Sequence, residues 1–280
     1  MAGGVKNVCD LVGKKERGEK ITMLTAHDAA FGVLVDQAGV DMILVGDSLG
    51  MVALGYNSTV PVSMDEMIHH AKAVRRGVEK ALVVGDMPFL SYQADIKEAV
   101  LNAGRFLKEA GCVAVKMEGG SAIVPTVLAV VRAGIPVMGH IGLTPQTAGQ
   151  LGGFKVQGRD DDSARRLIVE AEALADAGVF ALVLECVPAL LARKISNAVK
   201  IPTIGIGAGP YCDGQVLVTH DLLGLFSRFV PRFAKRYATL ADEAATALEA
   251  FKDEVERGVF PAAENSFGPL IEDNGPAADK

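Results

Sequence analysis

Tryptophan is absent from this 280-residue chain, aromatic residues make up only 5% of it, and no long basic run occurs. With a formal net charge of −6, the chain is not expected to bind nucleic acid or an anionic membrane surface. Its four cysteines show no CxxC or other metal-ligand spacing, so we interpret all of them as structural thiols. Small molecules are therefore the expected partners.

Targeting and membrane signals are also missing. The opening MAGGVKNVCD contains neither an apolar signal segment nor an Arg-rich transit pattern. No stretch reaches the roughly 18 consecutive apolar residues of a membrane-spanning helix. We therefore expect a soluble, cytoplasmic protein.

What the chain does contain is a regular alternation of short β-branched runs and longer stretches of helical period. Hydrophobic residues make up 50% of it, and its length fits one eight-stranded α/β barrel. Eight strands are predicted, at residues 21–25, 42–45, 81–84, 113–116, 135–138, 181–184, 201–204 and 215–219. The sequence thus predicts a single-domain (β/α)8 TIM barrel over residues 1–267.

Several segments depart from this alternation. Residues 49–64 are long for a βα connection, so we interpret them as an active-site loop leading into a helix that begins near Ser63. The Gly-rich segment 142–162 is interpreted as a flexible lid or an inter-subunit arm. Helical period at residues 234–256 predicts extra C-terminal helices, and the polar tail 268–280 is expected to be disordered.

Charged residues recur at the carboxyl end of the apolar runs. Active sites of such barrels lie at that end of the strands. The positions are Asp47, Asp86, Lys116 with Glu118, His140 and Glu185. An Asp after a strand can also cap a helix, and a single Lys or His there is more often structural. Five such strand ends together favour a functional site.

The residue types indicate a hard divalent cation and an anionic substrate. Asp47 and Asp86 follow strands that are neighbours in the predicted barrel, where they can converge on one Mg²⁺. Lys116 and Glu118 are two residues apart and so share one face of a strand. Because no second histidine stands near His140 at ligand spacing, a transition-metal site is the weaker alternative. A 2-oxo acid could chelate such a magnesium ion.

A Gly-rich segment, GIGAGPYCDG at residues 205–214, raises the possibility of a phosphate loop. Its spacing matches neither GxGxxG nor a Walker motif. Tight turns and close approach of the backbone are the preferred interpretation.

Six phrases in order closely resemble the ketopantoate hydroxymethyltransferase family. The resemblance runs from about Val5 to Phe267. The phrases are MLTAHDAAFG (23–32), GDSLGMVALGYNSTVPVSMDEMIHHAKAVRRG (46–77), VVGDMPFLSYQ (83–93), VKMEGG (115–120), VMGHIGLTPQ (137–146) and IGIGAGPYCDGQVLVTHDLLGL (204–225).

This resemblance implies an activity and a fold. The activity is transfer of a hydroxymethyl group from 5,10-methylenetetrahydrofolate to 3-methyl-2-oxobutanoate, giving 2-dehydropantoate in pantothenate biosynthesis through a magnesium-stabilised enolate. A TIM-type barrel is implied as well, as is a homo-oligomer, a decamer of two pentamers.

By matching motif, the resemblance also assigns roles to residues. It makes Asp47 and Asp86 magnesium ligands and substrate contacts, with Glu118 supporting the metal. Ser48 and Lys116 would bind the oxo acid. Beside these assignments, we expect His140 to contact the substrate and either to orient the site or to assist proton movement. Glu185 resembles the proton acceptor.

Two alternatives stay open. A metal-dependent lyase or mutase of the isocitrate lyase and phosphoenolpyruvate mutase type would use a similar barrel, but its Lys-Lys-Cys-Gly-His loop does not occur here. A non-catalytic barrel that binds a metabolite would not need carboxylates, a cation and a separate base at one mouth.

Overall fold

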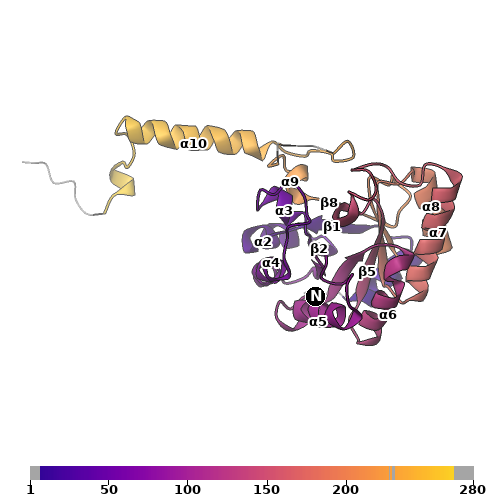
Figure 1. The fold of residues 1–280 in the computed structure, drawn as a ribbon. Coiled ribbons are helices and arrows are strands. Elements are labelled where there is room, and N and C mark those ends of the chain that lie inside the picture. Colours follow the sequence, from indigo (N-terminus) through magenta and orange to yellow (C-terminus); the bar gives the residue numbers. More distant parts are fainter. Residues whose placement is uncertain (1–6, 227, 229–230, 268–280) are drawn as a thin grey trace, which may run out of the picture.

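Eight parallel strands close into one barrel in the computed structural model of this chain, which describes residues 7–226, 228 and 231–267. Each strand pairs with the next in chain order, and β8 pairs with β1 (Figure 1). The strands are β1 (Ile21–Thr25), β2 (Met42–Val45), β3 (Leu82–Asp86), β4 (Ala114–Glu118), β5 (Val137–Gly142), β6 (Ala181–Glu185), β7 (Thr203–Ile206) and β8 (Gly214–Leu217). The predicted TIM barrel is confirmed, with β1 and β2 at the predicted bounds and the other strands a few residues away from theirs.

Helices accompany the strands in the described part of the chain: one precedes β1, two follow β8, and the others connect successive strands from β1 to β7. They are α1 (Val8–Glu16), α2 (Ala29–Gln37), α3 (Leu49–Val52), α4 (Met64–Gly77), α5 (Ile96–Lys108), α6 (Val124–Arg132), α7 (Asp161–Asp176), α8 (Ala189–Ala198), α9 (Thr219–Leu222) and α10 (Leu240–Glu256), with short 3-10 turns at Ser121–Ile123, Pro145–Thr147 and Ala263–Asn265. The predicted helix start near Ser63 is confirmed, because the Ser63 side chain caps α4 and Glu66 completes a capping box.

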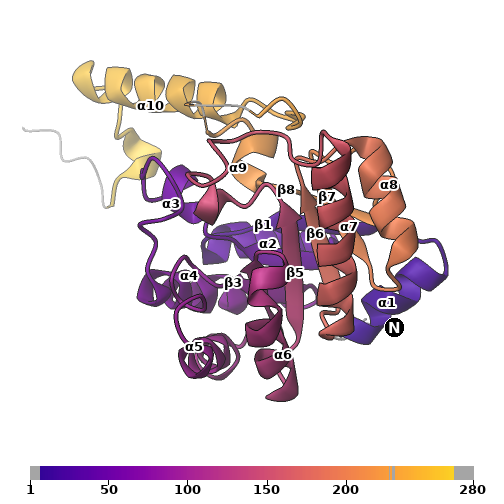
Figure 2. The ribbon, with the colours of Figure 1, turned by 45° about the vertical axis from the view of Figure 1, so that its right-hand side comes forward.

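Two apolar clusters follow from the alternation of side chains along the strands. Within β2, Met42 and Leu44 belong to a cluster that fills the barrel, whereas Ile43 and Val45 pack outward against the helices. The inner cluster draws on all eight strands and also includes Leu11 of α1. Figure 2 shows α1 at the end of the barrel opposite α3 and α9. The amino-terminal end of the barrel is thereby closed, and the carboxyl end stays available for a site.

The C-terminal region corrects one prediction. Helical period predicted a helix from residue 234, but α10 begins only at Leu240. α9 ends before Gly224, which has a φ of +69°, and Tyr237 and Leu240 donate backbone hydrogen bonds to Leu222 and Leu223. The chain here folds back on α9 instead of continuing as a helix.

α10 extends away from the barrel (Figure 1) and buries none of its residues. The predicted disordered tail, 268–280, lies outside the described residues. Among the helices of the described part of the chain, none is long and apolar enough to cross a membrane.

Gly85 offers a test of the barrel-to-helix packing. A Cβ at Gly85 would lie 2.1 Å from Phe106 Cδ1 of α5. We therefore expect Gly85→Ala to lower the free energy of unfolding in urea by about 1–3 kcal/mol. Gly104→Ala, in the same α5 but with nothing within 4 Å of the added carbon, should raise it by up to about 1 kcal/mol. Equal effects of the two variants would contradict this packing.

Candidate functional site

A cavity of about 160 Å³ opens at the carboxyl end of the barrel. The strand-end residues singled out by sequence all line it, and so do parts of both long loops. Its lining includes Asp47, Ser48, Asp86, Lys116, Glu118, His140 and Glu185 from the strand ends, Met51, Val52 and Thr59 from the first loop, and Pro145 and Phe154 from the second.

Strand register brings the charged residues together. Asp86 points into the barrel, as Leu82 and Val84 of the same strand do. It lies beside Lys116 of the neighbouring strand β4. Glu118 lies beside His140 of β5 in the same way. Because both pairs sit near the carboxyl ends of adjacent strands, their side chains enter the cavity at this level of the barrel, with Glu118 and His140 one step beyond Asp86 and Lys116.

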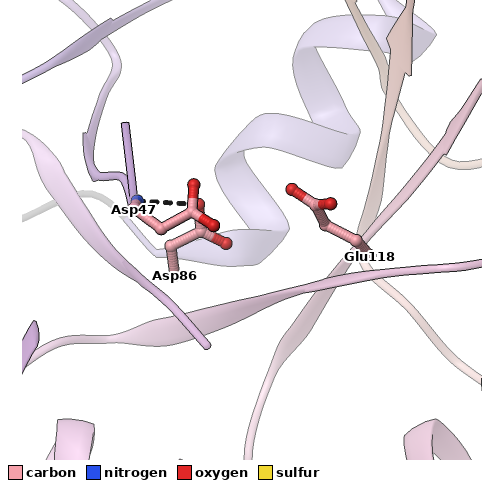
Figure 3. Close-up of side chains that lie close together, drawn as sticks. All are labelled: Asp47, Asp86 and Glu118. Carbon is pink, nitrogen blue, oxygen red and sulfur yellow. Dashed lines mark hydrogen bonds between the residues drawn. The ribbon is translucent and has the colours of Figure 1, made fainter. Parts of the chain in front are cut away.

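Three buried carboxylates converge at this level (Figure 3). Asp47, Asp86 and Glu118 are 4%, 1% and 5% exposed, and each offers an oxygen within 4.8 Å of the others. The Asp47 backbone N–H donates to Asp86 Oδ2 at 3.2 Å, which fixes the turn after β2 against β3.

Lys116 compensates part of the negative charge. Its Nζ lies 2.7 Å from Asp86 Oδ1 and 3.2 Å from Glu118 Oε1. Burial alone would lower the pKa of Lys116, but the neighbouring carboxylates raise it, so the lysine stays charged. One lysine cannot balance three carboxylates. Burial, together with the negative charge of Asp86, accordingly raises the pKa of Asp47 well above its usual range.

The surplus negative charge fits a divalent metal ion. The trio supplies only hard oxygen donors, which Mg²⁺ prefers. A cation placed between the three oxygens would relieve the repulsion that raises the pKa of Asp47. Asp47, Asp86 and Glu118 are the residues in the described part of the chain that could hold such an ion.

Gln146 and Tyr92 hold the trio in place, a role that sequence reasoning missed. Gln146 Nε2 donates to Asp47 Oδ2 at 2.9 Å, and its backbone N–H donates to Glu118 Oε2 at 3.2 Å. The Tyr92 hydroxyl accepts from the Glu118 N–H at 3.0 Å and lies 2.9 Å from Gln146 Oε1. Both residues stand within phrases of the family resemblance, and that is the signal that could have identified them.

His140 connects the carboxylate trio to Glu185. Its Nδ1 lies 3.4 Å from Glu118 Oε1 and its Nε2 lies 3.3 Å from Glu185 Oε2. Burial lowers the pKa of His140, but Glu118 more than offsets this and raises it. The Glu185 side chain is more open than the trio, at 15% exposure, and Cys186 immediately after it has a φ of +49°. This left-handed backbone conformation ends β6 directly after Glu185.

Two hydroxyls in the cavity have no hydrogen-bond partner. Ser48 Oγ and Thr59 Oγ1 are both buried without one in the described structure, and both residues line the cavity. Ser48 was a predicted substrate contact, whereas Thr59 was not identified from the sequence. A buried hydroxyl without a partner is costly unless a ligand satisfies it.

The Gly-rich segment 205–214 forms tight turns, which was the interpretation preferred from the sequence over a phosphate loop. Gly207 and Gly209 have φ values of +65° and +76°. Added Cβ atoms there would lie 2.8 Å from Phe233 and 2.5 Å from Ala189. Close packing therefore accounts for these two glycines.

Known proteins resemble this chain along almost its whole length. The family model described as ketopantoate hydroxymethyltransferase matches residues 6–263. A 3-methyl-2-oxobutanoate hydroxymethyltransferase from Moorella thermoacetica is 65% identical over 257 residues, covering 92% of this chain and 96% of that protein. The protein of the same name from Desulfotalea psychrophila is 58% identical over 262 residues, covering 94% of each.

Among solved structures, a phosphoenolpyruvate phosphomutase from Streptomyces platensis superimposes with a TM-score of 0.61 at 17% identity, over 95% of this chain and 93% of that one. At this identity the likeness shows a shared barrel fold only.

Metal binding by the trio can be measured without a reaction. We expect Mg²⁺ to raise the thermal unfolding temperature, by the equivalent of about 2.7 kcal/mol at a hundredfold excess over Kd. Asp47→Asn should remove most of this rise. Without metal, the variant should be no less stable than the parent, because the substitution removes a carboxylate that its neighbours repel.

Asp36→Asn serves as the control. Asp36 accepts backbone hydrogen bonds from residues 79–81 outside the cavity, so its loss should lower the unfolding temperature but leave the Mg²⁺ effect intact. An undiminished Mg²⁺ effect in Asp47→Asn would remove the trio as the metal site.

Proposed function

The chain belongs to the ketopantoate hydroxymethyltransferase family, and from this premise we propose that it transfers a hydroxymethyl group from 5,10-methylenetetrahydrofolate to 3-methyl-2-oxobutanoate. The product would be 2-dehydropantoate, a precursor in pantothenate biosynthesis. The observation that carries the proposal is the meeting of a carboxylate trio, a buried lysine and a separate carboxylate in one cavity.

The oxo acid would bind between the trio and Lys116. Its carboxylate carries a negative charge that the lysine can offset. The unpartnered hydroxyl of Ser48 offers it a hydrogen bond, and Thr59 offers a second one from the first loop. These contacts would hold the substrate with C3 exposed to the remaining part of the cavity.

Asp47, Asp86 and Glu118 would hold Mg²⁺. When bound, the ion would act as a Lewis acid that makes a C–H beside a ketone acidic enough to remove. Gln146 and Tyr92 would keep the carboxylates in position for it, since groups that orient metal ligands also tune metal affinity.

Glu185 would take the proton from C3. It lies on β6, whereas the trio follows β2, β3 and β4, so base and metal ligands approach the substrate from different parts of the barrel wall. His140 would hold the Glu185 carboxylate through the 3.3 Å contact and is a positioning residue in this scheme. The deprotonated C3 would then attack the methylene carbon of the folate. Both carbon–nitrogen bonds of the methylene group, to N5 and to N10, would break, and water would supply the hydroxyl oxygen. The two nitrogens of the released tetrahydrofolate would take up the proton removed from C3 and one proton of the water.

The lyase or mutase alternative rests on fold likeness alone. The phosphomutase barrel superimposes on this one, but its sequence is far less similar than those of the named transferases. A non-catalytic metabolite-binding barrel would have no need of Glu185 opposite the trio.

Proton exchange tests the function. The protein is incubated with 3-methyl-2-oxobutanoate in D₂O, with Mg²⁺ or EDTA, and the C3 proton is followed by NMR before and after 5,10-methylenetetrahydrofolate is added. We expect Mg²⁺-dependent exchange and then 2-dehydropantoate. Absence of both from folded protein would contradict the proposal and favour the alternatives.

Glu185→Gln separates the base from the metal site. We expect the variant to keep the Mg²⁺-dependent rise in unfolding temperature, but to lose exchange and turnover by about 10²- to 10⁴-fold, because the amide cannot accept the C3 proton. Glu172→Gln, an exposed position on α7, should keep full activity. Normal turnover of Glu185→Gln would exclude Glu185 as the base.

We also propose a homo-oligomer, a decamer of two pentamers, as the family resemblance implies. Support comes from α10, where Leu248 and Phe251 are 69% and 55% exposed, since apolar side chains on a projecting helix are typical of an interface. Light scattering should give ten times the chain mass. Phe251→Asp should lower the measured mass, whereas Glu249→Gln on the same helix should not. A monomeric parent protein would contradict the assembly.

A further inference from the structure

Asp221 is a buried carboxylate of the cavity that the proposed reaction does not use. It lies on α9, after β8, and is 6% exposed. It lines the same cavity as the trio, but it is not part of the group that could hold a metal. Its Oδ1 is buried without a hydrogen-bond partner in the described structure.

Asp221 forms no ion pair within the described residues. Burial raises the pKa of Asp221 to about 6, and Arg236 opposes the rise only in part. Arg236 donates instead to the backbone oxygen of Phe226, at 3.4 Å, and forms no ion pair within the described residues. A buried carboxylate with one oxygen left without a hydrogen-bond partner is an unfavourable arrangement for a group with only a structural role.

The backbone holds Asp221 in place. The Thr219 N–H donates to Thr25 Oγ1 at 3.0 Å, which ties the start of α9 to the end of β1. The Asp221 N–H donates to the Val218 oxygen at 3.0 Å. Because its backbone is already held in place, this carboxylate can accept hydrogen bonds from a ligand at little cost in conformational entropy.

The surroundings of Asp221 indicate the kind of ligand. Val218, Phe226 and Phe233 line the cavity along with it. Apolar walls with one carboxylate suit a flat ring that presents N–H donors along one edge, and they disfavour an anion. The anionic oxo acid already has its place beside Lys116, so the second substrate is the candidate for this part of the cavity.

We propose that Asp221 binds the pterin ring of the folate substrate by accepting hydrogen bonds from its N3–H and 2-amino groups. The inference rests on the proposed function, since that function brings the folate into the cavity. These two donors are parallel and adjacent, and a carboxylate accepts such a pair with both oxygens. Asp221 thus determines specificity for the one-carbon donor and has no part in removing the C3 proton.

Asp221→Asn tests this assignment because an amide keeps the size but offers one acceptor and one mismatched donor. We expect KM for 5,10-methylenetetrahydrofolate to rise at least tenfold and direct binding of tetrahydrofolate to weaken equally, with KM for the oxo acid unchanged. Exchange of the C3 proton in D₂O without folate should also be unchanged. Asp176→Asn, an exposed position on α7, is the matched control and should alter none of these.

A second measurement excludes a structural role. A tetrahydrofolate that lacks the 2-amino group should bind the parent protein at least tenfold more weakly than tetrahydrofolate, whereas Asp221→Asn should discriminate little between the two. The unfolding temperature of Asp221→Asn should equal or exceed that of the parent, because the substitution removes a buried unpaired charge.

Each outcome separates the inference from the proposed function. If the parent binds tetrahydrofolate through Asp221 but forms no 2-dehydropantoate, the pterin assignment stands and the transferase proposal fails. If the parent transfers the hydroxymethyl group and Asp221→Asn has an unchanged folate KM, the pterin assignment is overturned. It is also overturned if the parent does not bind tetrahydrofolate, or if Asp221→Asn unfolds at a lower temperature and weakens both substrates alike.

Discussion

The burial of one lysine among three carboxylates is the interaction on which the whole site depends. Lys116 contacts Asp86 and Glu118 directly, and Asp47 joins the group through the turn after β2. Breaking a buried ion pair by removing one partner typically costs about 3–5 kcal/mol, because the other charge is left uncompensated. A cation between the carboxylates would relieve their mutual repulsion, and Lys116 supplies a positive charge beside them.

The barrel makes this arrangement possible through register and alternation. On β3 the inward side chains Leu82 and Val84 are apolar and Asp86 at the carboxyl end is charged, whereas on β4 the apolar Ala114 is followed by Lys116 and Glu118. The same register that pairs Asp86 with Lys116 and Glu118 with His140 also joins adjacent strands by backbone hydrogen bonds. A slip of one residue would turn the charged side chains out of the cavity, so stability and function are determined by the same pairing. Gln146 and Tyr92 then fix the carboxylates from the outer side.

Much of the fold and of the site's membership could be predicted from the sequence, because strand periodicity and charged strand ends are local signals. Residues such as Asp86 and Glu185 end short apolar runs, and parallel strands bring such ends together. Gln146 and Asp221 could not be found in this way, since neither ends an apolar strand: each lies in a short helical turn that is placed by tertiary contacts. The predicted start of the C-terminal helix was wrong for a related reason. The apolar spacing of residues 234–239 continues that of α10, but Tyr237 donates its backbone hydrogen bond to Leu222 of α9.

The central claim is that the trio, Lys116 and Glu185 act on one bound oxo acid. A crystal structure of the protein with Mg²⁺ and 3-methyl-2-oxobutanoate tests it most directly. It should place the ion about 2.0–2.1 Å from oxygens of Asp47 and Asp86 and of the substrate, with Glu118 supporting it, Lys116 near the substrate carboxylate and Glu185 facing C3. An ion held by other residues, or a substrate whose C3 faces away from Glu185, would contradict it.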